Sequence, residues 1–181
     1  MRLLAIDIGN SNVVWGVFDD ERLIADWRVG TDAAKTADEY GILLLDLLGV
    51  KGLVPESLDA VILSSVVPPL TATFEELAEK YLHRVPLTVS FELKTGLTLQ
   101  YENPAEIGTD RIVNAAAAFR QYGGPVIIVD FAARRQSLFF DPPSPHLYIS
   151  DHTLALAVWG PGGRTSHGTP QRPSEPSEVA K

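Results

Sequence analysis

The chain has 181 residues, of which 45% are hydrophobic and 21% charged, with a formal net charge of −8 and no cysteine. This composition is typical of a soluble globular protein, and the absence of cysteine excludes disulfides and thiolate metal sites. The net negative charge argues against a nucleic-acid-binding surface, although it leaves room for a local basic patch. No apolar run approaches the roughly 18 residues of a transmembrane helix, and the first residues, MRLLAIDIGNSN, do not resemble a secretory signal. We therefore expect a cytoplasmic protein that binds neither membranes nor nucleic acid.

The first 30 residues predict an antiparallel β-meander. Residues 3–8 are a short apolar run that ends near an aspartate, and turn-forming residues follow at 9–12. Residues 13–18 are rich in β-formers, and residues 23–29 alternate apolar and polar side chains. The glycine-containing turn then joins the first two of three strands.

Helices and strands alternate over the following hundred residues. Helices are expected at 40–48, behind a capping box of Thr36 and Glu39, at 71–82 and at 107–122; strands are expected at 60–67, 86–89, 97–101 and 126–131. A meander followed by alternating strands and helices predicts an α/β fold.

The composition changes after Phe131. Residues 1–131 hold 10 Lys+Arg and 19 Asp+Glu, whereas residues 132–181 hold 5 and 4, together with 7 of the 13 prolines. Stretches such as GTPQRPSEPSE are typical of loops or disorder. We expect a first domain at 1–122, the first strand of a second domain at 123–131, and an atypical, poorly ordered tail at 132–181.

The segment AIDIGNSN is the first candidate site. Asp7 ends a strand, and Gly9 lets the backbone of the turn approach a phosphate, because successive N–H groups form an anion-binding nest. The carboxylate of Asp7 could hold a hydrated magnesium ion beside those phosphates. A plain hairpin turn is the alternative, since Asn and Gly favour turns with or without a ligand.

The segment GTDR is the second candidate site, at the start of a predicted helix. A helix N-terminus favours anions, Arg111 could clamp a carboxylate, and Asp110 could accept a hydroxyl proton during phosphoryl transfer. In the alternative, Thr109 or Asp110 merely caps the helix and Arg111 is solvated.

Asp130 is the third candidate, at the end of a strand otherwise made of Val and Ile. A carboxylate at the end of a buried strand is costly unless it is paired or bound to a metal ion. The alternative is a loop aspartate just outside the core.

In this order, DIGNSN, SSVVP (residues 64–68), Tyr101, GTDR and VDF (residues 129–131) resemble the type III pantothenate kinases, a family of the acetate/sugar kinase and actin superfamily. The resemblance runs over residues 1–131. It implies an α/β fold of the ribonuclease H-like (actin-like ATPase) class, with an N-terminal β-meander and a truncated second domain.

The resemblance further implies ATP-dependent phosphorylation of pantothenate, the first step of coenzyme A biosynthesis, by a homodimer. The ATP phosphates would be met by Asp7, Ile8, Gly9, Asn10, Ser11 and Asn12, with Mg²⁺ near Asp7. Pantothenate would be held by Tyr101, Gly108, Thr109, Asp110 and Arg111. Asp110 would be the catalytic base, and Asp130 would bind a monovalent cation, K⁺ or NH₄⁺.

The sequence departs from the family pattern at one point. The family continues after the VDF strand with a second phosphate-binding turn, Gly-Thr-Ala-Thr-Thr, whereas here Ala-Ala-Arg-Arg-Gln follows. Ala133 stands where the resemblance places a threonine that contacts ATP. We therefore expect the activity of this chain to be impaired.

A frameshift would explain the departure. The codons of Ala-Ala-Arg-Arg-Gln, read from the third base of the first codon, can spell Gly-Thr-Ala-Thr. We hypothesise that the reading frame changes near the codon of Ala132. The nucleotide sequence tests this hypothesis, which fails if neither alternative frame continues like the family.

Two other functional classes are open on the residues alone. One is a non-catalytic regulator or binding protein on the same fold, similar to the accessory factors for transcription described among relatives of this family. The other is an α/β domain whose motifs are ordinary turns and caps. Retention of Asp7, Asp110, Arg111 and Asp130 favours the kinase, because a binding protein need not keep all four.

Overall fold

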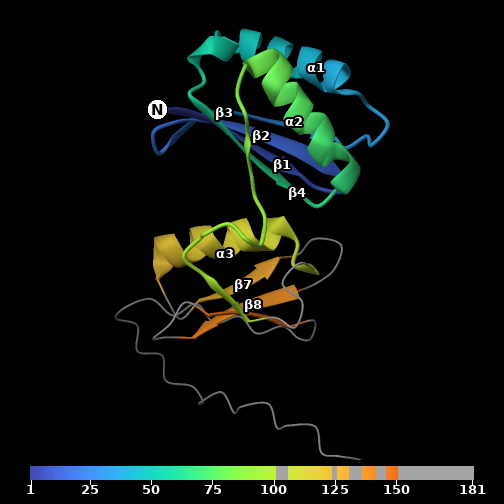
Figure 1. Cartoon of the computed structure of the whole chain (residues 1–181). Helices are drawn as coiled ribbons and strands as arrows, with labels where there is room; N and C mark the ends of the chain where they lie inside the picture. Colours follow the sequence, from blue (N-terminus) through green and yellow to red (C-terminus); the bar gives the residue numbers. More distant parts are fainter. Residues whose placement is uncertain (101–105, 124–125, 131–135, 142–145, 151–181) are drawn as a thin grey trace, which may run out of the picture.

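The computed structural model describes residues 1–100, 106–123, 126–130, 136–141 and 146–150. Its described strands form a five-stranded sheet, in the order β3-β2-β1-β4-β5, and a four-stranded sheet, in the order β6-β9-β8-β7 (Figure 1). The first sheet contains β1 (Arg2–Ile8), β2 (Asn12–Asp19), β3 (Arg22–Gly30), β4 (Ala60–Ser65) and β5 (Leu87–Thr88). The second contains β6 (Thr98–Gln100), β7 (Ile127–Asp130), β8 (Gln136–Asp141) and β9 (His146–Ser150).

The first sheet confirms the predicted meander. Strands β1, β2 and β3 pair in antiparallel fashion, and β4 then pairs with β1 in parallel. In this register Asp7 lies opposite Ser64, and Ile8 lies opposite Ser65. The end of β1 and the end of β4 therefore meet at one edge of the sheet.

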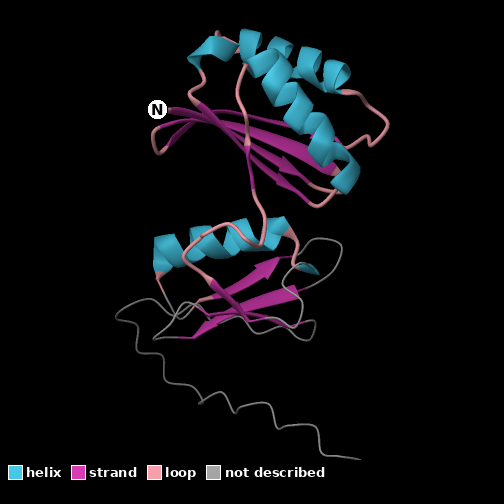
Figure 2. Cartoon of the chain, viewed as in Figure 1, coloured by secondary structure: helices cyan, strands magenta, loops and turns pink. Residues whose placement is uncertain are grey.

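Helices α1 (Ala37–Val50) and α2 (Pro68–Leu82) cover one face of this sheet (Figure 2). Alternate residues of β1 (Leu4, Ile6 and Ile8) are buried, as a strand with one covered face requires. Trp15 and Phe74 are both fully buried, with ring centroids 6.5 Å apart, so they join β2 to α2. This layer is the main hydrophobic core of the described part of the chain.

The helix starts follow local chemistry. The predicted capping box is present: Thr36 Oγ1 accepts a hydrogen bond from Glu39 N–H (3.3 Å), and Glu39 Oε2 accepts one from Thr36 N–H (2.9 Å). Helix α2 begins at Pro68 and not at residue 71, because a proline in the first turn loses no intrahelical hydrogen bond. Helix α3 (Thr109–Tyr122) begins two residues after the predicted position.

Helix α3 contacts both β4 of the first sheet and β7 of the second. In Figure 1 the second sheet lies beyond α3, on the side away from α1 and α2. The strand predicted at 97–101 is β6, which belongs to the second sheet. The second sheet therefore includes residues that precede the domain boundary expected at 122–123. No helix among these described residues is long and apolar enough to cross a membrane.

After residue 131 the structure describes two further strands, and the expected domain division stays a prediction. No regular element was predicted with confidence there, yet β8 and β9 pair with each other, and β8 also pairs with β7. The segment QSLFFD does not alternate apolar and polar residues, because Leu138, Phe139 and Phe140 are consecutive, so its sequence gives no clear strand signal. The expectation of a poorly ordered tail otherwise concerns residues outside the described part.

A close contact between α1 and α2 gives a stability prediction. A Cβ placed on Gly41 would lie 2.5 Å from the Tyr81 ring, whereas one placed on Gly49 of the same helix would meet nothing within 4 Å. We expect Gly41→Ala to lower the free energy of unfolding by about 1–3 kcal/mol, because the helices must move apart. Gly49→Ala, the matched control, should leave it unchanged or raise it by up to about 1 kcal/mol. Urea denaturation measures both, and equal values would contradict the contact.

Candidate functional site

The turn between β1 and β2 is held by hydrogen bonds to its carbonyl oxygens. Gly9 N–H donates to Asn12 O at 2.9 Å and closes the turn. Val66 N–H donates to Ile8 O, and Thr31 donates twice, from its amide to Ser11 O and from its hydroxyl to Gly9 O. These four carbonyls are bonded within the protein, so the amides of the turn are among the groups that it can still offer to a ligand.

Asn10 and Ser11 supply such amides. Both residues are exposed, and within the described chain their N–H groups have no hydrogen-bond partner. The turn is also tight at Gly9, where a Cβ would lie 3.2 Å from Asn12 O. Adjacent outward N–H groups on a glycine turn are the arrangement that binds phosphate oxygens.

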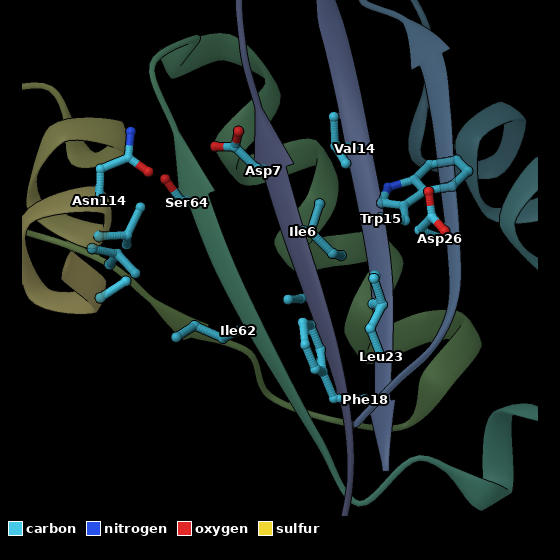
Figure 3. A pocket seen from close by; sticks show the side chains of 15 residues that line it. Ile6, Asp7, Val14, Trp15, Phe18, Leu23, Asp26, Ile62, Ser64 and Asn114 are labelled. Carbon is cyan, nitrogen blue, oxygen red and sulfur yellow. The ribbon is translucent and has the colours of Figure 1, made fainter. Parts of the chain in front are cut away.

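The carboxylate of Asp7 lies beside this turn. Asp7 is exposed at the end of β1 and points to the sheet face opposite α1 and α2, the same face as its register partner Ser64. Figure 3 shows both side chains at one end of a cavity, with Asn114 of α3 facing them. A carboxylate beside amides that bind phosphate suits a hydrated divalent cation.

The cavity itself has a volume of about 560 Å³ and lies between the sheet and α3. Its walls are mostly apolar, with Phe18 and Leu23 along the sheet and Val113 on the helix (Figure 3). A mostly apolar cavity with a few polar groups at one end is typical of a small-molecule site. The sequence did not predict this cavity, because it forms only when α3 packs against β4 beside the open face of the first sheet.

Thr109 ties the start of α3 to the end of β4. Its Oγ1 accepts a hydrogen bond from Ser65 N–H (3.0 Å), donates to Ser65 O (2.9 Å) and lies 3.1 Å from Ser64 Oγ. The buried side chains of Ile107 and Ile112 pack beside Ile62 of β4. These contacts place the GTDR segment next to β4, whose residue Ser64 lies opposite Asp7 of β1.

The side chain of Asp110 folds over Gly108. Asp110 Oδ1 accepts a hydrogen bond from Arg111 N–H at 2.8 Å, and a Cβ at Gly108 would collide with that carboxylate. Gly108 is the N-cap and makes no side-chain cap, and Arg111 N–H also donates to Gly108 O at 3.1 Å, so Asp110 Oδ1 shares this first-turn amide with a backbone carbonyl. The capping alternative therefore describes one oxygen of Asp110, and no described group bonds to the other.

Arg111 is half-buried and, among the described residues, has no carboxylate partner. A guanidinium placed one residue after Asp110 at a helix start can bind an incoming carboxylate in bidentate fashion. The second alternative, a solvated arginine, is also compatible with this position.

Two predicted site residues are not brought to this site by the described structure. Tyr101 lies outside the described residues, and Asp130 is the last residue of β7, where only its backbone pairing with Gln136 is described. No group of three His, Asp or Glu side chains within the described ranges is arranged to hold a metal ion. The magnesium and monovalent-cation sites therefore stay predictions.

Sequence reasoning did not single out Thr31 and gave Ser64, part of the SSVVP motif, no role in the site. Ser64 is buried, with 6% of its surface exposed, and its hydroxyl lies beside Thr109 Oγ1. A serine at the end of a predicted buried strand was the available signal. Thr31 had no local signal, because its partners lie about 20 residues earlier in the chain.

Gly108 gives a prediction that follows from this packing. We expect Gly108→Ala to displace the Asp110 carboxylate and to lower any activity that depends on it about tenfold or more, since small misplacements of catalytic groups are costly. Gly30→Ala is the control, because a Cβ there would meet nothing within 4 Å. Comparing turnover by the two variants measures the effect, and equal turnover would show that the contact with Gly108 does not position Asp110.

Comparison with known families identifies a match over most of the chain. Residues 3–133 match the model of the family described as type III pantothenate kinase. The match ends two residues beyond Phe131, which is the last residue of the resemblance. It includes the turn at residues 9–12, the end of β4 and the start of α3.

Curated relatives carry the same description. The chain is 54% identical over 129 residues to a type III pantothenate kinase of Geobacter sulfurreducens, covering 71% of this chain and 51% of that protein. It is 49% identical over 139 residues to one of Brevibacillus brevis, covering 77% of this chain and 54% of that protein. The chain thus spans about half the length of the curated relatives it matches.

Among solved structures the similarity is weaker. A Ppx/GppA phosphatase of Aquifex aeolicus aligns with a TM-score of 0.47 at 14% identity, covering 83% of this chain and 52% of that one. YeaZ from Pseudomonas aeruginosa aligns with a TM-score of 0.43 at 16% identity, covering 82% of this chain and 66% of that one.

Proposed function

Because this chain belongs to the type III pantothenate kinase family, which it matches over residues 3–133, we propose that it phosphorylates pantothenate with ATP. The described sheets and helices confirm the predicted α/β fold, and its ribonuclease H-like class remains what the resemblance implies. The observation that carries the proposal is the hydrogen bonding of Thr109 to Ser64 and Ser65, because it joins the GTDR segment to the strand beside Asp7.

The turn at residues 9–12 would bind the phosphates of ATP. The outward amides of Asn10 and Ser11 support this role, together with the fixed carbonyls behind them. Asp7 would hold Mg²⁺ through its water shell, and a carboxylate oxygen is a ligand that this ion prefers. When bound, the ion would neutralise phosphate charge, which is a main source of catalysis in such transfers.

Pantothenate would bind at the start of α3. Its carboxylate suits Arg111, and its hydroxyl would meet the oxygen of Asp110 that is not bonded to Arg111 N–H. Asp110 would take the proton of that hydroxyl as the oxygen attacks the terminal phosphorus of ATP. Thr109 would not contact pantothenate through its hydroxyl, since that group is bonded to β4.

Several parts of the proposal rest on the resemblance alone. These are the roles of Tyr101 in holding pantothenate and of Asp130 in binding K⁺ or NH₄⁺, the homodimer, and a cytoplasmic location. Asp130 ends a strand, which is a common place for a cation ligand, but its side chain is not described. Omission of the monovalent cation from the assay tests its role directly.

The changed segment after Phe131 is expected to lower the rate of phosphorylation. Ala133 replaces the threonine expected to contact ATP, so we propose an impaired enzyme rather than a fully active one. A coupled assay of ADP release, with and without pantothenate and with K⁺ or Na⁺, tests the proposal. Release that depends on both pantothenate and K⁺ supports it, and release that is independent of pantothenate contradicts it.

A further inference from the structure

Thr31 makes two hydrogen bonds to the turn at residues 9–12 from outside it. Its hydroxyl donates to Gly9 O at 2.7 Å, and its amide donates to Ser11 O at 3.0 Å. The residue follows the last residue of β3 and is half-buried. One side chain and its own backbone thus hold two of the turn's carbonyls.

Thr31 is itself fixed from behind. The hydroxyl of Tyr40, a fully buried residue of α1, accepts a hydrogen bond from Asp32 N–H at 2.9 Å and donates to Asp32 O at 3.1 Å. The loop is closed further by Ala34 N–H, which donates to Asp32 Oδ1, and by Lys35 N–H, which donates to Asp32 O. The position of Thr31 is therefore set by the core helix α1.

From this geometry we infer that Thr31 is a positioning residue, whose hydroxyl orients the peptide between residues 9 and 10 so that the amide of Asn10 faces a phosphate group. A peptide unit whose carbonyl is bonded on one side presents its N–H on the other. Without the bond to Gly9 O, the peptide between residues 9 and 10 could rotate and withdraw the Asn10 amide. Preorganised amides bind an anion without this rotation, which would otherwise reduce the affinity.

This inference rests on the proposed function for the identity of the anion, but the hydrogen bonding that it describes does not. The two can therefore be tested separately. We call the two hydrogen bonds from Thr31 to Gly9 O and Ser11 O the Thr31 brace. Amide hydrogen exchange reports the Thr31 brace, and titration with Mg²⁺ and ATP, or with inorganic tripolyphosphate, reports the anion site.

The test compares three variants of the whole chain. Thr31→Val removes the hydroxyl at nearly constant volume, Thr31→Ser keeps it, and Thr73→Val removes a threonine hydroxyl that bonds to Pro69 O in α2, away from the turn. In Thr31→Val, exchange of Gly9 N–H and of the residue 31 amide should become roughly three- to tenfold faster, the effect of one lost hydrogen bond. Tripolyphosphate affinity should fall by a similar factor of about three to ten.

Thr31→Ser should restore both values, and Thr73→Val should change neither. Unchanged amide exchange in Thr31→Val would show that the Thr31 hydroxyl does not stabilise the turn. Faster exchange without any loss of tripolyphosphate affinity would show that the Thr31 hydroxyl does not orient the turn amide toward the anion. If the unsubstituted chain binds neither ATP nor tripolyphosphate while exchange still responds to Thr31→Val, the Thr31 brace stands as a structural feature. In that case the proposed phosphate site and the orienting role built on it both fail.

Discussion

Asp110→Asn should lower the rate of pantothenate phosphorylation by about 10²–10⁴-fold, which is the usual contribution of a general base. The asparagine amide cannot take the proton of the attacking hydroxyl at neutral pH. Its carbonyl oxygen can still accept the hydrogen bond from Arg111 N–H that Asp110 Oδ1 accepts now. We therefore expect kcat to fall while the KM for pantothenate changes little.

Asp46→Asn is the matched control for this substitution. Asp46 is an exposed carboxylate of α1, on the far side of the first sheet from the start of α3. Its replacement removes the same charge and should leave turnover unchanged. Equal activity of the Asp110→Asn and Asp46→Asn variants would show that Asp110 is not the catalytic base.

Asp7→Asn should weaken the binding of Mg²⁺ with ATP by about ten- to hundredfold, the range found when a partner of a bound metal ion is removed. The loss of negative charge beside the phosphate turn should act on the metal-bound nucleotide rather than on pantothenate. Titration calorimetry with Mg²⁺ and a non-hydrolysable ATP analogue measures the effect. The KM for pantothenate should remain close to its original value.

Asp26→Asn is a close control, because Asp26 is an exposed carboxylate on β3 that lines the same cavity as Asp7 (Figure 3). Both substitutions remove one negative charge from the same face of the sheet. Only Asp7 lies at the strand end beside the turn amides. Equal weakening by the two substitutions would point to a general field effect and against a magnesium position at Asp7.

The sequence was informative where a feature depends on residues close together in the chain. The meander, the capping box of Thr36 and Glu39, and the glycine turn were all predicted because turn and cap chemistry is local. The same holds for the start of α3, which lies within two residues of the predicted position.

The features that were missed depend on tertiary contacts. Thr31 reaches Gly9 across 22 residues, and Thr109 reaches Ser65 across 44, so no local pattern marks either bond. The close approach of the Asp110 carboxylate to Gly108 could not be predicted from the sequence either, because it depends on the rotamer of Asp110. The tertiary structure thus shows that the Thr109 hydroxyl links α3 to β4, and a contact between Thr109 and pantothenate stays a prediction.

The change of composition after Phe131 now coincides with the end of the family match at residue 133. Both observations describe the same amino-acid sequence, so the frameshift stays a prediction. Sequencing of the gene tests it: a continuation encoding Gly-Thr-Ala-Thr and further family-like residues in another frame is expected. A gene without such a continuation in either frame would refute the frameshift and leave the kinase proposal standing.

The most direct test of the central claim is mass spectrometry of the product. The purified chain is incubated with pantothenate, ATP, Mg²⁺ and K⁺, and 4′-phosphopantothenate is measured against the same reaction with Asp110→Asn. Mass spectrometry is chosen because it detects slow turnover, which the loss of the second phosphate-binding turn leads us to expect. We predict product that accumulates with time for the unsubstituted chain and is reduced at least a hundredfold by Asp110→Asn, the lower end of the general-base effect at roughly 10². No product above that of Asp110→Asn would contradict the assignment of this chain as a pantothenate kinase.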